Sequence, residues 1–290
     1  RYVDWLDNLQ MLQPAKAPFM SDTLDPDDWS QFRKRAHAML DAAIDQMETV
    51  QDGPVWQAPD EIDPVLAEPS FGNGATANDT FLKSLLPLSV GNTHPRFFGW
   101  VHGAGTPSGL ISEMIGAAMN ANCGGRNHAA IRVERAVIRW ALDLFGLPDA
   151  GSGVLTTGTS MATIVALKVA RDHALGFASR TAGVTDIAPL VGYTSQAAHS
   201  CMDRAFDMLG LGSDALRKIP TDAEGRIDIH ELGTAIAADI KAGRKPFAIC
   251  ATAGTVNAGA IDPLDTIADV ADTHGLWLHV DAAFASALQL

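Results

Sequence analysis

The sequence contains no apolar run of the roughly 18 residues that a transmembrane helix needs, and it lacks the basic-then-apolar pattern of a signal peptide. Basic residues are few: 21 Lys and Arg stand against 34 Asp and Glu, and the formal net charge is −13. No block of five like charges occurs, so nothing attracts nucleic acid or an anionic membrane. These absences predict a soluble, cytoplasmic protein whose partner is a small molecule.

Cysteine is scarce as well. Cys123, Cys201 and Cys250 are an odd number at long spacings without a CxxC pair, which favours reduced thiols over a disulfide framework or a zinc site. The sequence also lacks a GxGxxG turn, an HExxH motif and any cluster of His and Cys, which argues against a nicotinamide cofactor and against a metal.

The length of 290 residues suits one large α/β domain with an additional arm. Residues 1–85 are expected to form this arm, with amphipathic helices over 4–12 and 27–50 and an extended connector over 53–78. Because the arm has little core of its own, we expect it to pack on a second subunit, which predicts a homodimer. Residues 86–290 are expected to form the large domain.

Helical and strand-like segments alternate with short loops in the large domain. This order predicts a doubly wound α/β domain with a mainly parallel sheet and helices on both faces. Helices are expected over 107–121, 130–145, 159–175, 197–209, 228–241 and 263–275, the last capped by Asp262. Strands are expected over 154–157, 189–193, 215–219, 247–252 and 276–280.

The strand over 276–280 is expected to be buried and to carry one acidic residue, Asp281, at its end. Ligands of open α/β sheets lie beyond the carboxyl ends of the strands, so Asp281, followed by the small Ala282 and Ala283, is a candidate charge partner for a bound group. The alternative is an Asp that only caps the next turn.

A turn of small residues, Gly158, Thr159 and Ser160, connects the predicted strand at 154–157 to a helix. Backbone N–H groups and hydroxyls at such a helix start can hold a phosphate. Two alternatives remain open. Thr and Ser are ordinary N-cap residues, and the turn also approaches a GxSxG nucleophile elbow in which Ser160 would be the nucleophile.

Aromatic residues and glycines are dense over 94–105. This composition suits the wall of a ligand pocket, with a buried corner of the core as the alternative. Together, the turn at 158–160, His199, Thr255 and Asp281 offer a phosphate cradle, an imidazole, a hydroxyl and a carboxylate at strand ends. Pyridoxal phosphate needs these groups from a protein. Taken alone, a histidine at the position of His199 is more often a core or helix-start residue than a ligand contact.

In these motifs the sequence resembles the pyridoxal-phosphate-dependent group II amino acid decarboxylases, which include the aromatic-L-amino-acid, histidine and glutamate decarboxylases. The matching segments run in order over most of residues 90–290. They are His94-Pro95-Arg96-Phe97-Phe98, Thr157-Gly158-Thr159-Ser160-Met161-Ala162, Ala198-His199-Ser200, Thr252-Ala253-Gly254-Thr255-Val256, Gly259-Ala260-Ile261-Asp262 and His279-Val280-Asp281-Ala282-Ala283.

The resemblance implies a fold type I, aminotransferase-like large domain in a homodimer, with the N-terminal arm crossing to the other subunit. Pyridoxal phosphate would be the cofactor, and Gly158, Thr159 and Ser160 would bind its phosphate. The reaction would be the decarboxylation of an L-amino acid, most simply an aromatic one. The net negative charge and the lack of an Arg pair near the turn at 158–160 argue against a diacid such as glutamate, although Arg96 and Arg126 could serve. Another fold type I lyase, a serine hydrolase using Ser160 and a non-catalytic homologue remain alternatives.

The resemblance also implies roles around the cofactor ring. His199 would stack on the ring, and Asp281 would pair with the pyridine nitrogen. Thr255 and Asp262 would support the ring and its neighbours, and Ala283 would lie against the opposite face. His199, Asp281 and Thr255 would then be the catalytic residues. Trp100, Val101 and His102 match the stretch that lines the substrate pocket in the family.

The sequence departs from the family in two places. Met161 stands where the family has an acidic residue in the phosphate turn. The His-Lys pair that forms the Schiff base in the family would come after Asp281, beyond the last residue, Leu290. Because the chain also begins at Arg1 without a Met, we expect a fragment that is cut within a domain and is inactive alone.

Overall fold

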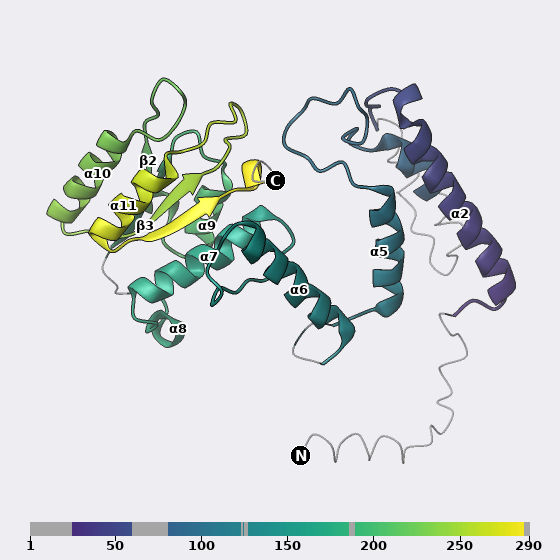
Figure 1. Ribbon diagram of the computed structural model, residues 1–290, viewed down its shortest axis with the longest axis horizontal. Coiled ribbons are helices and arrows are strands. Elements are labelled where there is room, and N and C mark those ends of the chain that lie inside the picture. Colours follow the sequence, from purple (N-terminus) through teal and green to yellow (C-terminus); the bar gives the residue numbers. More distant parts are fainter. Residues whose placement is uncertain (1–24, 60–80, 123, 125–126, 186–188, 287–290) are drawn as a thin grey trace, which may run out of the picture. The chain divides into compact units, whose positions relative to one another are not determined.

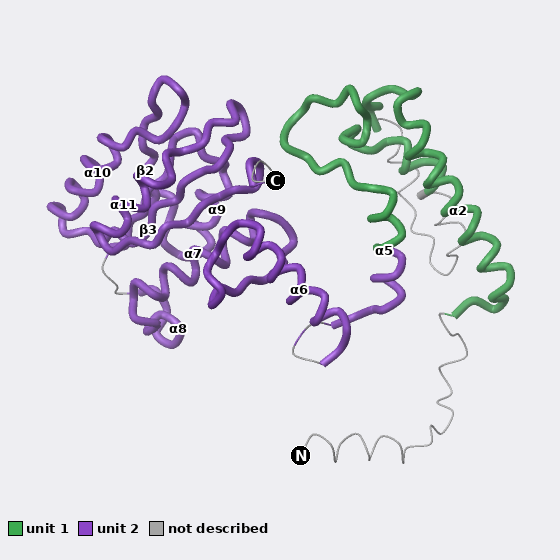
Figure 2. Tube along the Cα trace, in the orientation of Figure 1, with its two compact units in different colours: residues 1–113 green, residues 114–290 purple. Residues whose placement is uncertain are grey.

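The computed structural model describes residues 25–59, 81–122, 124, 127–185 and 189–286. The chain divides into two compact units, residues 1–113 and residues 114–290 (Figure 2). The predicted boundary at 85/86 falls inside the first unit, and the division into an arm and a large domain stays a prediction. The helix expected over 4–12 lies outside the described residues, as do residues 60–78 of the expected connector.

The first unit contains the long helix α2, Trp29–Thr49, which confirms the helix expected over 27–50. The Asp28 carboxylate caps it by accepting hydrogen bonds from the backbone N–H groups of Ser30 at 2.8 Å and Gln31 at 3.1 Å. The helical turns that follow are η1, Val50–Asp52, η2, Phe81–Leu85, and η3, Leu86–Leu88.

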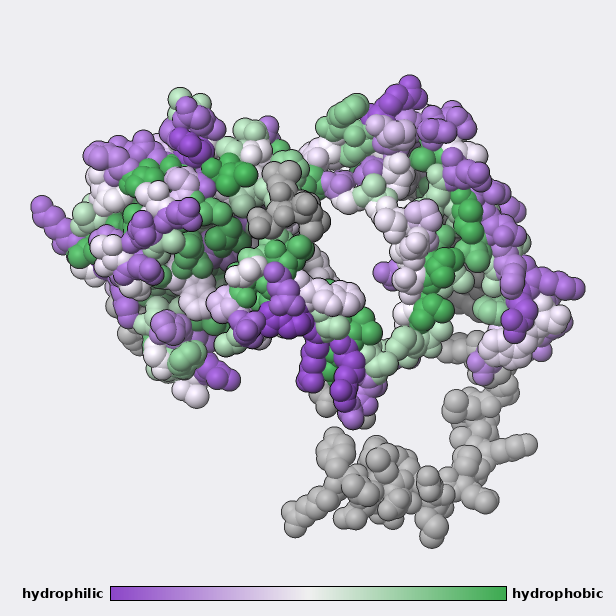
Figure 3. All heavy atoms as spheres, viewed as in Figure 1, coloured by the Kyte–Doolittle hydropathy of each residue, from purple (hydrophilic) through white to green (hydrophobic). Residues whose placement is uncertain are grey.

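Helix α5, Pro107–Met119, begins in the first unit and ends in the second. It presents an apolar stripe to solvent, and Figure 3 shows hydrophobic colour along it. Four side chains at helical spacing are 45–59% exposed: Ile111, Met114, Ile115 and Met119. Since exposed apolar patches of this kind mark interaction sites, the stripe is a candidate contact surface.

A four-stranded parallel sheet forms the centre of the second unit, with the strand order β2-β1-β3-β4. Its strands are β1, Leu190–Ser195, β2, Leu216–Ile219, β3, Lys245–Thr252, and β4, Trp277–Asp281. Each was expected from its apolar run. The register pairs Thr252 with Asp281, so β3 and β4 end side by side.

Helices cover the sheet on both faces (Figure 1). The helices of this unit are α6, Ala129–Leu144, α7, Thr159–Ala174, α8, Ser179–Ala182, α9, Cys201–Met208, α10, Ile229–Lys241, and α11, Leu264–His274, with a short turn η4, Ser213–Ala215. Cys250 of β3 packs with α7 and α9, while its neighbour Ile249 packs with α10 and α11. This alternation gives two cores and confirms the doubly wound α/β fold.

The strand expected over 154–157 is wrong. Val154 and Leu155 are exposed coil, and the Leu155 N–H donates to Glu134 Oε1 at 3.1 Å rather than to a neighbouring strand. An apolar run becomes a strand only where a partner strand supplies the ladder of hydrogen bonds. Among the described residues no strand lies beside this segment.

Strand β4 is present but is not buried on both faces as expected. It lies at the edge of the described sheet with β3 as its neighbour, and Val280 is 37% exposed. Trp277 packs on the core with α7 and α9, and Leu278 packs on the core with α10 and α11, so both faces of β4 are covered only in part. Asp281 at its end is nevertheless buried, with 7% of its surface exposed.

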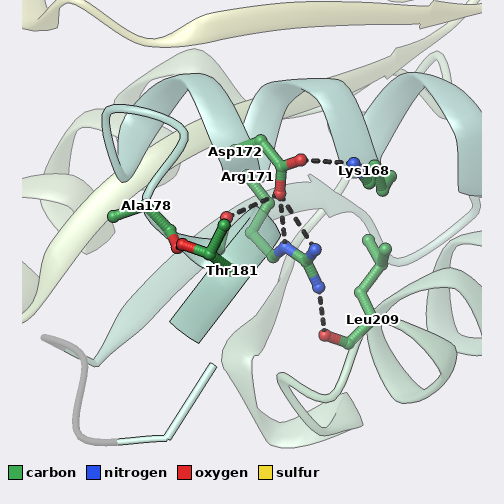
Figure 4. Close-up of polar contacts among 7 residues, drawn as sticks. Lys168, Arg171, Asp172, Ala178, Thr181 and Leu209 are labelled. Carbon is green, nitrogen blue, oxygen red and sulfur yellow. Dashed lines mark hydrogen bonds and ion pairs between the residues drawn. The ribbon is translucent and has the colours of Figure 1, made fainter. Parts of the chain in front are cut away.

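A buried carboxylate network joins α7 to the segments that follow it (Figure 4). Asp172 accepts hydrogen bonds from Lys168, from Ser179 Oγ at 2.8 Å and from Arg171 Nη2 at 2.9 Å. Arg171 Nη1 in turn donates to the Leu209 carbonyl at 2.8 Å. Burial by itself would raise the pKa of the Asp172 carboxyl, but these donors outweigh it and lower the pKa to about 2.

Among the described residues, no helix has both the length and the apolar character that crossing a membrane requires.

Candidate active site

The carboxyl ends of β1, β3 and β4 bring several of the expected site residues together in the second unit. Asp281 is the last residue of β4, and its carbonyl accepts the Ala253 N–H at 2.8 Å just after β3 ends. Thr255 and Asp262 belong to the loop that follows β3, and His199 follows β1. These groups therefore all follow the carboxyl ends of strands of one parallel sheet, which is the end where such sheets bind ligands.

The Asp281 carboxylate is held on both oxygens. The Ala283 N–H donates to Oδ1 at 3.1 Å, and the thiol of Cys201 lies 3.6 Å from Oδ2. Asp281 thus caps the next turn, as the alternative interpretation had it. Because a carboxylate oxygen has two lone pairs, Oδ1 can accept a second hydrogen bond besides the one from the Ala283 N–H. Both oxygens can still accept from a bound cation.

His199 lies two residues before the start of α9, and it is exposed. Its Nδ1 accepts the Cys201 N–H at 3.2 Å, which leaves Nε2 as the protonated nitrogen of the neutral ring. Because Cys201 also contacts Asp281, the imidazole and the carboxylate are linked through one residue. The exposed ring, fixed at one edge, is available to stack on a ligand.

The turn at 158–160 precedes α7 in the expected way. Gly158 has φ = 116°, a backbone conformation that favours glycine, and α7 begins at Thr159. The first N–H groups of a helix have no intrahelical acceptor, so this end can bind an anion. Thr163, one turn into α7, donates to the Cys201 sulfur at 3.9 Å. Through Cys201, the first turns of α7 are therefore connected to Asp281, and the assignment of the turn to the same site stays a prediction.

The residue that contacts Ser160 is an arginine, which cannot serve as the general base that a serine hydrolase needs. Its Oγ accepts a hydrogen bond from Arg204 Nη2 at 3.3 Å, and Arg204 Nη1 donates to Ser200 Oγ at 2.9 Å. A guanidinium cannot take a proton from a serine. The structure gives Ser160 no hydrogen bond to a described His or carboxylate, and its positive neighbour suits an anion instead.

Thr255 and Asp262 shape the loop after β3. The buried Thr255 Oγ1 accepts the Ala260 N–H at 3.1 Å. Asp262 was expected to cap the next helix, and this is wrong: α11 begins after Pro263 without a side-chain cap. The buried carboxylate instead accepts the N–H groups of Ile227 at 2.7 Å and Thr252 at 2.8 Å. Burial raises its pKa despite these bonds.

Gly254 in the same loop lies so close to the turn after Asp281 that there is no room for a side chain. The residue has φ = 93°, and a Cβ there would lie 2.9 Å from Ala285 Cβ and 3.0 Å from Phe284 Cδ1. The loop after β3 therefore packs directly on the turn after Asp281. Ala283, expected against the cofactor ring, lies in that turn and is exposed.

The expected substrate-pocket residues, Trp100, Val101 and His102, lie in the first unit. Trp100 is 74% exposed with φ = 53°, and its ring lies 5.6 Å from the His102 ring. The segment is therefore not a buried corner of that unit. The assignment of these residues to a substrate pocket stays a prediction.

The Cys201 contact was missed from the sequence. The sequence indicates only a reduced thiol at this position, and the structure shows that it is fully buried. Its place two residues after His199, at the start of a helix, is the sequence signal that could have drawn attention to it. Helix starts direct side chains towards the strand ends, but only the structure shows which side chain Cys201 meets.

Comparison with known proteins identifies the class. Residues 80–290 match the family model described as the pyridoxal-dependent decarboxylase conserved domain. Tyrosine decarboxylase 1 of Narcissus pseudonarcissus is 31% identical over 96% of this chain and 56% of its own length. Aromatic-L-amino-acid decarboxylase of Bacillus atrophaeus is 30% identical over 88% of this chain and 53% of its own.

Among solved structures, Oryza sativa TDC with PLP and tryptamine matches with a TM-score of 0.81 and 28% identity, over 92% of this chain and 58% of that one. The chain therefore belongs to the pyridoxal-dependent decarboxylase family and has its fold type I architecture, as the resemblance implied. It spans about half the length of the curated relatives it matches.

Proposed function

We propose that the full-length gene product is a pyridoxal-phosphate-dependent carboxy-lyase that converts an aromatic L-amino acid to its amine and CO₂. The observation that carries this proposal is the buried Asp281 carboxylate at the end of β4, linked through Cys201 to the start of α7. The family membership supports the cofactor. The names of the relatives, which include tyrosine, tryptophan and aromatic-L-amino-acid decarboxylases, support the aromatic substrate.

The residues present fit this cofactor. The open N–H groups at the start of α7 and the hydroxyls of Thr159 and Ser160 would hold its phosphate, with the Arg204 guanidinium adding positive charge nearby. The Asp281 carboxylate would accept the proton of the pyridine nitrogen as a charge-assisted hydrogen bond. A buried carboxylate beside the positive end of a helix suits a ligand that carries an anion at one end and a cation at the other.

Each side chain would then have a defined task. When bound, pyridoxal phosphate supplies a sink for the electron pair left at the substrate Cα when CO₂ departs. Asp281 would keep the ring nitrogen protonated, and His199 would cover one face of the ring. Thr255 would support the ring from the loop after β3, which Asp262 holds in place through two backbone N–H groups.

We also propose a cytoplasmic homodimer. The exposed apolar stripe of α5 supports an interface, and so does α2, which exposes Trp29 and Phe32. Analytical ultracentrifugation of the full-length gene product should give the mass of two chains, and a monomer across micromolar concentrations would contradict this part of the proposal.

The activity is tested by incubating the full-length gene product with pyridoxal phosphate and a panel of L-amino acids. We expect visible absorbance from bound cofactor, and release of CO₂ and amine from tyrosine, tryptophan or phenylalanine but not from glutamate. Aldehyde in place of amine would instead favour the kind of product for which one relative, phenylacetaldehyde synthase of Arabidopsis thaliana, 30% identical, is named. Absence of cofactor binding would contradict the proposal.

The serine hydrolase alternative has its own test. A fluorophosphonate probe labels a serine activated by a general base. The Arg204 contact predicts no labelling of Ser160, and stoichiometric labelling there would reverse the preference.

A further inference from the structure

Three buried groups from three elements form a chain of contacts behind the proposed site. Thr163 Oγ1 of α7 lies 3.9 Å from the sulfur of Cys201, the first residue of α9, and this sulfur lies 3.6 Å from Asp281 Oδ2 at the end of β4. Thr163 and Cys201 are fully buried. Because water does not reach the Thr163 hydroxyl and the Cys201 thiol, their hydrogens can point only to acceptors within the protein.

The direction of the chain follows from the donors available. An ionised carboxylate can only accept, so the thiol hydrogen of Cys201 points to Asp281. The Thr163 hydroxyl then donates to the sulfur. Burial and the nearby Asp281 charge both raise the pKa of the Cys201 thiol, so it stays protonated and remains a donor.

We propose that Cys201 is a positioning residue for Asp281, a role that rests on the proposed function of Asp281 at the cofactor. With Ala283 N–H fixing Oδ1 and the thiol fixing Oδ2, the carboxylate is held in one orientation, and its remaining lone pairs face the ligand. A thiol is a weak donor, so it orients the carboxylate while leaving most of the negative charge available to a protonated ring nitrogen.

The second buried thiol provides a matched control. Cys250 of β3 is also fully buried, and it packs in the same core cluster as Cys201. The structure gives its sulfur no hydrogen bond to Asp281. Cys201→Ala and Cys250→Ala therefore remove the same atoms from the same core, and only the first removes a contact to the carboxylate.

The first measurement needs no cofactor. Unfolding of the cofactor-free full-length gene product is followed in urea for each Cys variant, for Asp281→Asn and for the two double variants. We expect the Cys201 cycle to be non-additive by at least about twofold in the unfolding equilibrium constant, and the Cys250 cycle to be closer to additive, because Cys250 interacts with Asp281 through charge and without a hydrogen bond. Additivity in both cycles would overturn the inference, whatever the cofactor does.

The second measurement uses the loaded enzyme. Cys201→Ala should lower kcat about two- to fivefold with little change in KM, because the misoriented carboxylate matters most when negative charge enters the ring. Cys250→Ala should leave both constants unchanged. Equal effects of the two variants would refute a positioning role. If the Cys201 cycle is non-additive but the wild type binds no cofactor, the contact stands and the proposed function fails instead.

Discussion

Asp172 should make the stability of the second unit depend on acid pH. The ordinary pKa of an Asp carboxyl, 3.8, falls to about 2 in the folded protein, because Lys168, Ser179 and Arg171 donate to a buried carboxylate (Figure 4). At about 1.4 kcal/mol for each tenfold change in proton affinity, this difference contributes about 2 kcal/mol to folding. Since the folded-state pKa is the lower one, the contribution is complete above about pH 5 and disappears as the pH falls towards 2.

Asp172→Asn removes the charge and keeps the size. At pH 7 we expect the variant to lose about 2–4 kcal/mol of unfolding free energy, because two cationic side chains lose their buried partner. The loss should shrink steadily as the pH is lowered to 3. Urea unfolding followed by circular dichroism at pH 7, 5, 4 and 3 measures it in both proteins.

An exposed ion pair serves as the control for this experiment. Arg139 pairs with Asp143 on the surface of α6 at 2.7 Å, and Asp143→Asn should cost less than about 1 kcal/mol at any pH. If the loss in Asp172→Asn were the same at pH 7 and pH 3, the charge would not be its cause and the assigned pKa would be wrong.

Three further variants test the site and the core. Asp281→Asn should slow decarboxylation about a hundredfold and weaken cofactor binding by less, as single-turnover and binding measurements would show; a rate within about threefold of wild type would make Asp281 only a cap. Gly192→Ala should lower the free energy of unfolding in urea by about 1–3 kcal/mol, because the new Cβ would lie 2.5 Å from Phe206 Cζ. Adding Phe206→Leu should recover part of the loss, and full stability of the single variant would contradict the packing. Asp262→Asn should cost about 1–3 kcal/mol, because one of two buried N–H groups loses its acceptor, and an unchanged urea midpoint would refute this role.

The sequence predicted most of the fold because local signals and tertiary structure agree in the second unit. The apolar runs at β1 and β3 are buried along nearly their whole length, and helix α10 is capped by Asp228 where its pattern begins. The segment at 154–157 failed because strand formation depends on a neighbour, which no local pattern reveals. The burial of β4 was overestimated for the same reason, since edge and centre positions are properties of the sheet.

The sequence could predict the location of a site residue where that residue stands at the end of a strand or directly before a helix. Asp281 at a strand end and Gly158 before a helix are examples of this kind. Asp262 was not, because an Asp before a Pro looks like a helix cap until Ile227, 35 positions away, is seen to donate to it. The thiol contact of Cys201 likewise joins residues 80 positions apart, which spacing cannot show.

The sheet order also has a consequence for synthesis on the ribosome. β1 lies between β2 and β3, and both neighbours are translated after it. β3 begins at Lys245, 50 residues after β1 ends at Ser195. At about 5–20 residues per second, the fully buried residues of β1 wait roughly 3–10 s for their second partner. During that interval the nascent chain exposes a strand that is buried in the finished fold, so we expect its yield in cells to depend on chaperones that hold such segments.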